Sequence, residues 1–155
     1  MKKLLEIVAY AALVGVFAVV VKLLLTYTAK AAEPPRFSGI AAVVDADTIR
    51  VSGRPVRLCG INAEEANTRA GRMARAWVTL WLEGLEVHCT QVGHGTPCDG
   101  RSQATNRGRT VAQCFLGDED IAYWLVLEGH AKDWPEYSGG HYAEAERESR
   151  MESEE

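Results

Sequence analysis

The chain has 155 residues, 47% hydrophobic and 25% charged, a composition typical of a globular protein rather than a disordered one. That length is sufficient for one ordinary domain with a buried core but not for two. From residue 32 onward, twelve arginines and one lysine stand against twenty acidic residues, a net charge of about −7. This balance excludes a broadly basic protein that coats nucleic acid, so any polyanion would have to meet a local cluster of arginines.

The first 31 residues are predicted to be an export segment, either a signal peptide or a membrane anchor. Two lysines precede a nearly uninterrupted apolar run, and Ala29-Lys30-Ala31 fits a cleavage site after Ala31. Alternatively, residues 4–25 are long enough to remain as an anchor in the membrane. A buried core helix is the third interpretation. The first two predict that residues 32–155 lie outside the cytoplasm, membrane-anchored, secreted or periplasmic.

Three strands are predicted after a short linker at residues 32–36. Strand-like runs at 37–44, 47–52 and 56–61 are separated by turn signals, the second of which is Gly53-Arg54-Pro55. The strands should therefore follow one another as a meander.

A helix is predicted next, ended by Gly84. Its apolar residues recur at helical spacing and are expected to face the core: Ala70, Met73, Ala74, Trp77, Leu80 and Trp81. Strands are predicted at 85–92 and 109–116 on either side of a long polar loop, and two further helices follow. Five strands with a helix between the third and fourth predict an α+β fold, a five-stranded OB-type β-barrel with three helices.

The four cysteines lie in the part predicted to be exported, where disulfides persist: Cys59, Cys89, Cys98 and Cys114. Four cysteines allow three sets of pairs, and the sequence alone does not choose among them. A zinc site would use Cys89, His94 and Cys98, but it lacks a C-x-x-C pair and a clear fourth ligand. Disulfides are the favoured interpretation.

Polar residues concentrate at three places where predicted strands begin or end, namely 45–48, 57–65 and 106–109. Each has an ordinary explanation by itself. Aspartate in a turn bonds its own backbone, and glutamates suit the first turn of a helix. These explanations do not account for all three clusters in this order.

The motifs V-x-D-x-D-T-I-x-V, V-R-L-x-G-I-x-A-x-E and G-R-T-V-A-x-C together resemble the staphylococcal-nuclease-like, or thermonuclease, family. The stretch DWPEYSGGHYAEAE is also similar to the closing segment of its bacterial members. The resemblance covers about residues 37–147 and leaves 148–155 as an acidic tail. It implies a monomeric OB-fold endonuclease that hydrolyses the phosphodiester bonds of DNA or RNA with Ca²⁺.

The resemblance also implies roles for individual residues. Glu65 matches the general base, and Arg57 and Arg109 match the arginines that clamp the phosphate, whose planar forks suit bidentate contact. The implied calcium ligands are oxygen donors: Asp47, with Asp45 nearby, the residue at position 62, and the carbonyl of Ala63.

The sequence departs from the family at this metal site. In the family this turn usually has the sequence G-I-D-A-P-E, whereas here it is GINAEE. Asn62 therefore replaces an aspartate that binds calcium, and Glu64 replaces a proline. Asparagine keeps a coordinating oxygen but removes a charge, so calcium affinity should fall by about a factor of ten or more. Asp45 or Glu64 is a candidate to supply the missing charge.

Two functions remain open from the sequence. One is a working nuclease that needs more calcium, which the retention of Arg57, Glu65 and Arg109 favours. The other is an inactive module of the same fold that binds nucleic acid, polysaccharide or a protein at the cell envelope.

The resemblance further implies that Cys89 and Cys114 lie on neighbouring strands and can form a bridge. Cys98 competes for Cys89 in this interpretation, and Cys59 is either a buried thiol or the partner of Cys98. Trp134 and Tyr137 lie near the expected cleft as candidates to stack on bases, with core packing as the alternative.

Overall fold

The computed structural model describes residues 3, 10, 13–23, 35–93 and 95–153. The chain divides into two units, residues 1–33 and 34–155. In the first unit residues 13–23 are helical, and none of the described helices is both long and apolar enough to cross a membrane. Most of the predicted export segment, including the cleavage site after Ala31, lies outside the described residues.

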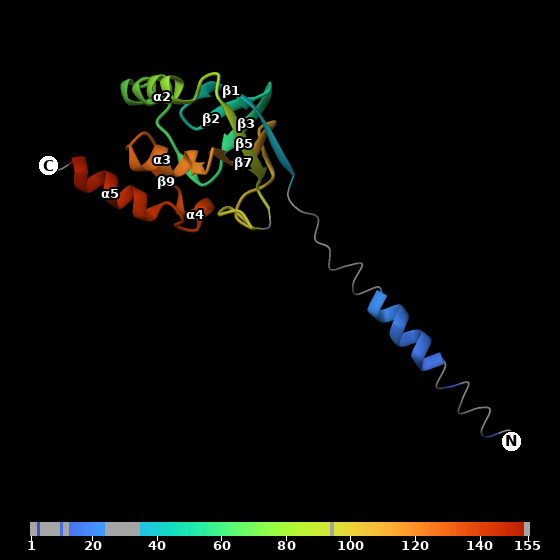
Figure 1. Ribbon diagram of the computed structural model, residues 1–155. Coiled ribbons are helices and arrows are strands. Elements are labelled where there is room, and N and C mark those ends of the chain that lie inside the picture. Colours follow the sequence, from blue (N-terminus) through green and yellow to red (C-terminus); the bar gives the residue numbers. More distant parts are fainter. Residues whose placement is uncertain (1–2, 4–9, 11–12, 24–34, 94, 154–155) are drawn as a thin grey trace. The chain divides into compact units, whose positions relative to one another are not determined.

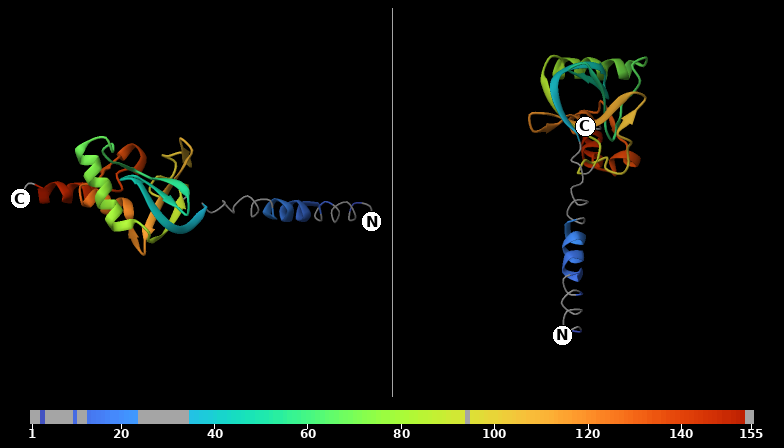
Figure 2. Two further views of the ribbon diagram at one scale, coloured as in Figure 1. Left: turned by 90° about the horizontal axis from the view of Figure 1, so that it is seen from above. Right: turned by 90° about the vertical axis from the view of Figure 1, so that its right-hand side faces the viewer.

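The second unit is built on a closed five-stranded barrel (Figures 1 and 2). Its strands are β1 (Arg36–Asp45), β2 (Thr48–Val51), β3 (Arg54–Leu58), β5 (Glu86–Gln91) and β7 (Arg109–Leu116). They pair in the order β3-β2-β1-β5-β7, and β3 runs parallel to β7 to close the barrel. The predicted α+β class and five-stranded barrel are confirmed, and this order is consistent with an OB-type barrel.

Four very short strands extend this framework: β4 (Ile61–Asn62), β6 (Thr105–Asn106), β8 (Glu119–Asp120) and β9 (Lys132–Asp133). β6 and β8 both pair with β7, whereas β4 and β9 form a separate two-stranded sheet. The pairing of β4 with β9 brings the segment after residue 131 against the turn that follows β3.

The helices of this unit are α2 (Arg69–Leu82), α3 (Ile121–Leu127), the single turn α4 (Pro135–Ser138) and α5 (Ala143–Ser153). In Figure 1, α2 lies along one side of the barrel and α3 to α5 gather on another. The three expected helices are present, with α4 in addition. Helix α5 continues through residues 148–153, which were expected to belong to an acidic tail.

The core-facing side of α2 differs from the predicted one. Met73 is 61% exposed and Leu80 is 91% exposed, while Trp77 and Trp81 are only partly buried. The buried positions are Gly71, Ala74, Val78 and Leu82. The helical period was right, and the predicted face was right in part, since Ala74 is buried and Trp77 and Trp81 pack against the core. Met73 and Leu80 lie outside because the small residues at 71 and 74 occupy the side of closest approach.

The structure shows how the four cysteines pair, which the sequence left open. Cys89 and Cys114 are directly opposite on β5 and β7 and are bonded, and Cys59 is bonded to Cys98. The zinc interpretation is wrong because each of its two cysteines is already in a disulfide.

Candidate functional site

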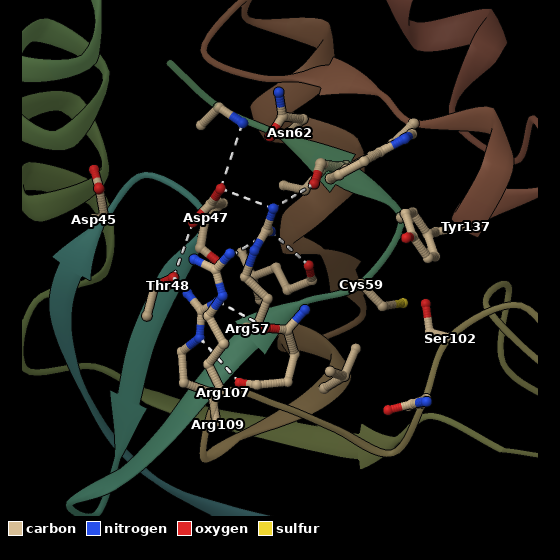
Figure 3. A pocket seen from close by; sticks show the side chains of 18 of the residues that line it. Asp45, Asp47, Thr48, Arg57, Cys59, Asn62, Ser102, Arg107, Arg109 and Tyr137 are labelled. Atoms are coloured by element: carbon tan, nitrogen blue, oxygen red, sulfur yellow. Dashed lines mark hydrogen bonds and ion pairs between the residues drawn. The ribbon is translucent and has the colours of Figure 1, made fainter. Parts of the chain in front are cut away.

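A cavity of about 870 Å³ opens where the β1–β2 turn, the end of β3 and the start of β7 meet (Figure 3). It is lined by every site residue that the sequence singled out: Asp45, Asp47, Arg57, Asn62, Ala63, Glu65, Arg109, Trp134 and Tyr137. The barrel topology explains this convergence, since β2 and β7 both flank β3.

A continuous chain of polar contacts joins all three polar clusters. Arg57 Nη2 lies 2.9 Å from Asp47 Oδ2. The Thr48 hydroxyl donates to Asp47 Oδ1 at 2.9 Å and accepts from Arg109 Nη1 at 3.0 Å. Residues up to 61 positions apart thus form one unit, in which Arg57 contacts the Asp47 carboxylate directly and Arg109 is linked to it through Thr48.

Arg57 also holds the turn that follows β3. Its guanidinium donates to the carbonyl oxygens of Leu58 and Ile61, each at 2.9 Å. The side chain is only 13% exposed. Burial lowers the pKa of Arg57 from its ordinary value, an effect that the neighbouring Asp47 opposes. An arginine remains protonated in proteins, so a fixed positive charge lies at the base of the cavity.

Arg109 differs from Arg57 in its partners: among the described residues, its side chain hydrogen-bonds only to uncharged groups. Besides Thr48, it donates to the side-chain oxygen of Asn106 at 3.3 Å and to its carbonyl oxygen at 3.4 Å. Within the described part of the chain, no carboxylate lies within ion-pairing distance of Arg109. Its charge is therefore available to an anion in the cavity.

The four residues predicted to supply oxygen donors for a cation all line the cavity. Asp45 accepts a hydrogen bond from the backbone of Ala46 at 2.9 Å, and Figure 3 shows it apart from Asp47. Asp47 Oδ2 accepts a hydrogen bond from the backbone N–H of Ala63 at 3.5 Å. Asn62, the residue before Ala63, is exposed. Among the described residues, no group of three or more acidic, histidine or cysteine side chains is placed to hold a metal.

This donor set nevertheless has the chemistry of a hard-cation site. A carboxylate, an amide oxygen and a carbonyl oxygen are ligands that calcium accepts. With one carboxylate, itself paired to Arg57, the set carries little net negative charge. The residues fit a weakly bound calcium ion.

Glu65 stands on a fixed backbone at the entrance to α2. Its carbonyl accepts from both the backbone N–H and the hydroxyl of Thr68, each at 2.9 Å. The same hydroxyl caps α2 by accepting from Gly71 N–H at 2.9 Å. The carboxylate of Glu65 is exposed and belongs to the cavity lining, so a rigid cap presents a free carboxylate there.

Replacing Gly71 with alanine should destabilise the protein, although this change inside a helix normally stabilises by roughly 0.5–1 kcal/mol. A methyl group at Gly71 would lie 2.6 Å from the carbonyl oxygen of Glu64 and closer still to that of Glu65. The turn would have to shift, at a cost of about 1–3 kcal/mol. Urea unfolding measures this change, with Ala76→Gly as the control for helix propensity, and a stabilised Gly71→Ala variant would contradict the packing.

Trp134 and Tyr137 form a T-shaped pair with ring centroids 4.7 Å apart. The backbone N–H of Trp134 donates to the carbonyl of Gly60 at 2.8 Å, which fixes the pair beside the turn after β3. Trp134 is 38% exposed. Part of the aromatic surface is therefore accessible from the cavity.

Among the polar residues of the cavity to which the sequence analysis gave no role are Thr48, Arg101 and Arg107. Thr48 links Asp47 to Arg109, and Arg101 and Arg107 line the cavity from the loop before β7. The Asp-Thr pair inside the first motif was a readable signal for Thr48. For the two arginines the only signal was positive charge in a loop, which is also typical of an exposed surface.

Comparisons with known proteins give one curated relative to report. No protein-family model matches the chain. Over 143 residues the chain is 32% identical to the succinoglycan biosynthesis protein ExoI of Rhizobium meliloti (strain 1021). The match covers 84% of this chain and 68% of that protein.

Proposed function

The chain belongs to the family of the succinoglycan biosynthesis protein ExoI, and on the basis of its site we propose that it is a calcium-dependent nuclease of the thermonuclease type. The observation that carries this proposal is the chain of contacts Arg57–Asp47–Thr48–Arg109 in a cavity that Glu65 also lines. It combines fixed positive charge, oxygen donors and a free carboxylate, which phosphodiester hydrolysis requires.

In the proposed reaction a water molecule attacks the phosphorus of a DNA or RNA phosphodiester. Glu65 accepts a proton from that water as the new oxygen–phosphorus bond forms. Arg57 and Arg109 donate hydrogen bonds to the phosphate oxygens, whose negative charge increases in the transition state. The bond to the leaving sugar oxygen breaks, and that oxygen takes a proton from solvent.

Asp47, Asn62 and the carbonyl of Ala63 are the residues that would hold the cation. Calcium supplies positive charge that orients the phosphate and stabilises the transition state when it is bound. Arg57 contributes in a second way, since its bonds to the carbonyls of Leu58 and Ile61 fix the turn that carries Asn62.

The proposal extends to fold and location. The strand order supports an OB-type barrel, a fold in which one face and its loops bind oligonucleotides or oligosaccharides. Two disulfides support an oxidising, extracytoplasmic environment. We propose that the domain is exported and stays at the membrane or is released, according to whether residues 1–31 are retained.

Incubation of the purified, oxidised full chain with single-stranded DNA and calcium tests this function. We expect fragments in millimolar calcium and none after chelation. A folded protein that leaves both DNA and RNA intact at every calcium concentration would overturn the proposal.

A second candidate function is a catalytically inactive module that acts in envelope polysaccharide assembly. The relative favours this candidate, since that protein is named for succinoglycan biosynthesis. Asn62, which stands where the thermonuclease family usually has an aspartate, is also consistent with lost catalysis. Retention by an acidic polysaccharide, with nucleic acid left intact, would support this candidate.

A further inference from the structure

We propose that Arg101 forms a second anion-binding subsite, which takes a phosphate group of a single-stranded nucleic acid next to the one being cleaved. This inference rests on the proposed function and adds a substrate requirement to it. The substrate would have to carry at least two phosphate groups, with an unpaired base between the two subsites.

The loop that carries Arg101 is fixed to the barrel. Cys98 is fully buried and bonded to Cys59 at the end of β3. The backbone N–H groups of Arg101 and Ser102 both donate to the carbonyl of Cys98 at 3.1 Å. Farther along the loop, the side-chain amide of Gln91 donates to the carbonyl of Ala104 at 2.9 Å. Arg101 therefore starts from a turn that the disulfide anchors beside the site.

The guanidinium of Arg101 lies against α4, on the wall of the cavity that also carries the aromatic pair. A Cβ built on Gly139 would lie 2.6 Å from Arg101 Nε and 3.0 Å from Cζ. Gly139 directly follows α4 and has a φ of 69°, a conformation that favours glycine. Figure 3 shows Ser102 and Tyr137 together at one side of the cavity, with Arg57 and Arg109 nearer its centre.

The charge of Arg101 has no acidic partner. In the described parts of the chain no carboxylate lies within 4.0 Å of its nitrogen atoms, and Glu136 of the cavity lining is no exception. Arg57, in contrast, is paired with Asp47. A guanidinium on a cavity wall that forms no ion pair with the described residues, and that starts from an anchored turn, is suited to bind a phosphate.

The space between the two charged positions suits an unpaired base. Trp134 and Tyr137 lie on the same wall as Arg101, and bases of single strands stack on such aromatic side chains. The cavity volume of about 870 Å³ lies toward the upper end of the range for small-molecule sites, roughly 300–1,000 Å³. A base inside a duplex would have its faces covered by its neighbours, so the arrangement favours single strands.

Fluorescence anisotropy with labelled octathymidylate in calcium tests this subsite, with thymidine 5′-monophosphate as a competitor of one phosphate. All proteins carry Glu65→Gln so that the probe is not cut. Arg101→Gln should weaken octathymidylate binding by about tenfold, and the slope of log Kd against log salt should fall by roughly 0.7. Binding of the monophosphate should stay unchanged.

Two matched variants complete the test. Arg75→Gln removes the same charge from the exposed surface of α2, outside the cavity lining, and should leave both affinities unchanged. Gly139→Ala should repeat part of the Arg101→Gln effect, because the new methyl group displaces the guanidinium.

The outcomes separate this inference from the proposed function. A nuclease that cleaves DNA but whose octathymidylate affinity is the same with Arg101→Gln would overturn the subsite alone. An equal loss for both ligands, or an equal loss with Arg75→Gln, would also overturn it. A protein that neither cleaves DNA nor binds octathymidylate would overturn both proposals.

Discussion

Glu65→Gln should lower kcat for single-stranded DNA by about 10²- to 10⁴-fold and leave KM nearly unchanged. The substitution keeps the size and shape of the side chain but replaces one carboxylate oxygen with an amide NH2 group, so the side chain can no longer accept the proton of the attacking water. Because the Glu65 side chain is exposed and its carbonyl alone supports the cap of α2, stability should change by less than about 0.5 kcal/mol. Single-turnover cleavage and urea unfolding measure the two effects.

Glu64 provides the matched control for this experiment. It is also exposed, lines the same cavity and precedes α2, so Glu64→Gln makes the same charge change one residue away. We expect a much smaller loss of kcat with this variant. Equal losses would show that the site requires negative charge in general, and full activity of Glu65→Gln would remove Glu65 from the mechanism.

Replacement of Arg57 should lower both activity and stability, whereas replacement of Arg109 should lower mainly activity. Arg57→Gln should abolish cleavage and also lower the free energy of unfolding by about 3 kcal/mol, because it leaves Asp47 without its ionic partner and frees the carbonyls of Leu58 and Ile61. Arg109→Gln should reduce kcat by roughly 10²-fold or more but change stability by less than about 1 kcal/mol. Its bonds are to Thr48 and Asn106, and it neutralises no carboxylate among the described residues.

Cleavage kinetics combined with urea unfolding distinguish these contributions. An Arg57→Gln protein as stable as the wild type would contradict the claim that the ion pair and the carbonyl contacts of Arg57 stabilise the fold. An Arg109→Gln enzyme with unchanged kcat would contradict the phosphate clamp.

The fold was largely predictable because strong local signals agreed with one another. The strand runs, their turns and the order of helix and strands were each readable, and the family resemblance singled out Asp47, Arg57 and Arg109, which line one cavity. Local patterns were sufficient here since β1, β2 and β3 are consecutive and joined by short turns. The family resemblance also indicated Cys89–Cys114 as a possible cross-strand bridge, with Cys98 as the competing partner of Cys89, and the structure shows the Cys89–Cys114 bond.

The remaining features depend on contacts that sequence spacing does not encode. The periodicity of α2 gave a helix and part of its buried face, but Met73 and Leu80 are exposed. Gly71 carries no hydrophobic signal although it packs closely against the preceding turn. The placement of Arg101 depends on the Cys59–Cys98 disulfide, and four cysteines alone do not reveal their pairing. Asp45 lines the cavity as predicted, but its hydrogen bond to the backbone N–H of Ala46 could not be read from the spacing of the motif.

We propose that this cavity is a phosphodiesterase site whose affinity for calcium is lowered by Asn62. The most direct measurement is the rate of single-stranded DNA cleavage as a function of calcium concentration, for the oxidised full chain and for Asn62→Asp. We expect calcium-dependent cleavage by both proteins, with the calcium midpoint lowered about tenfold or more in Asn62→Asp by the added carboxylate beside Asp47. No cleavage by either folded protein, at any calcium concentration, would contradict this proposal.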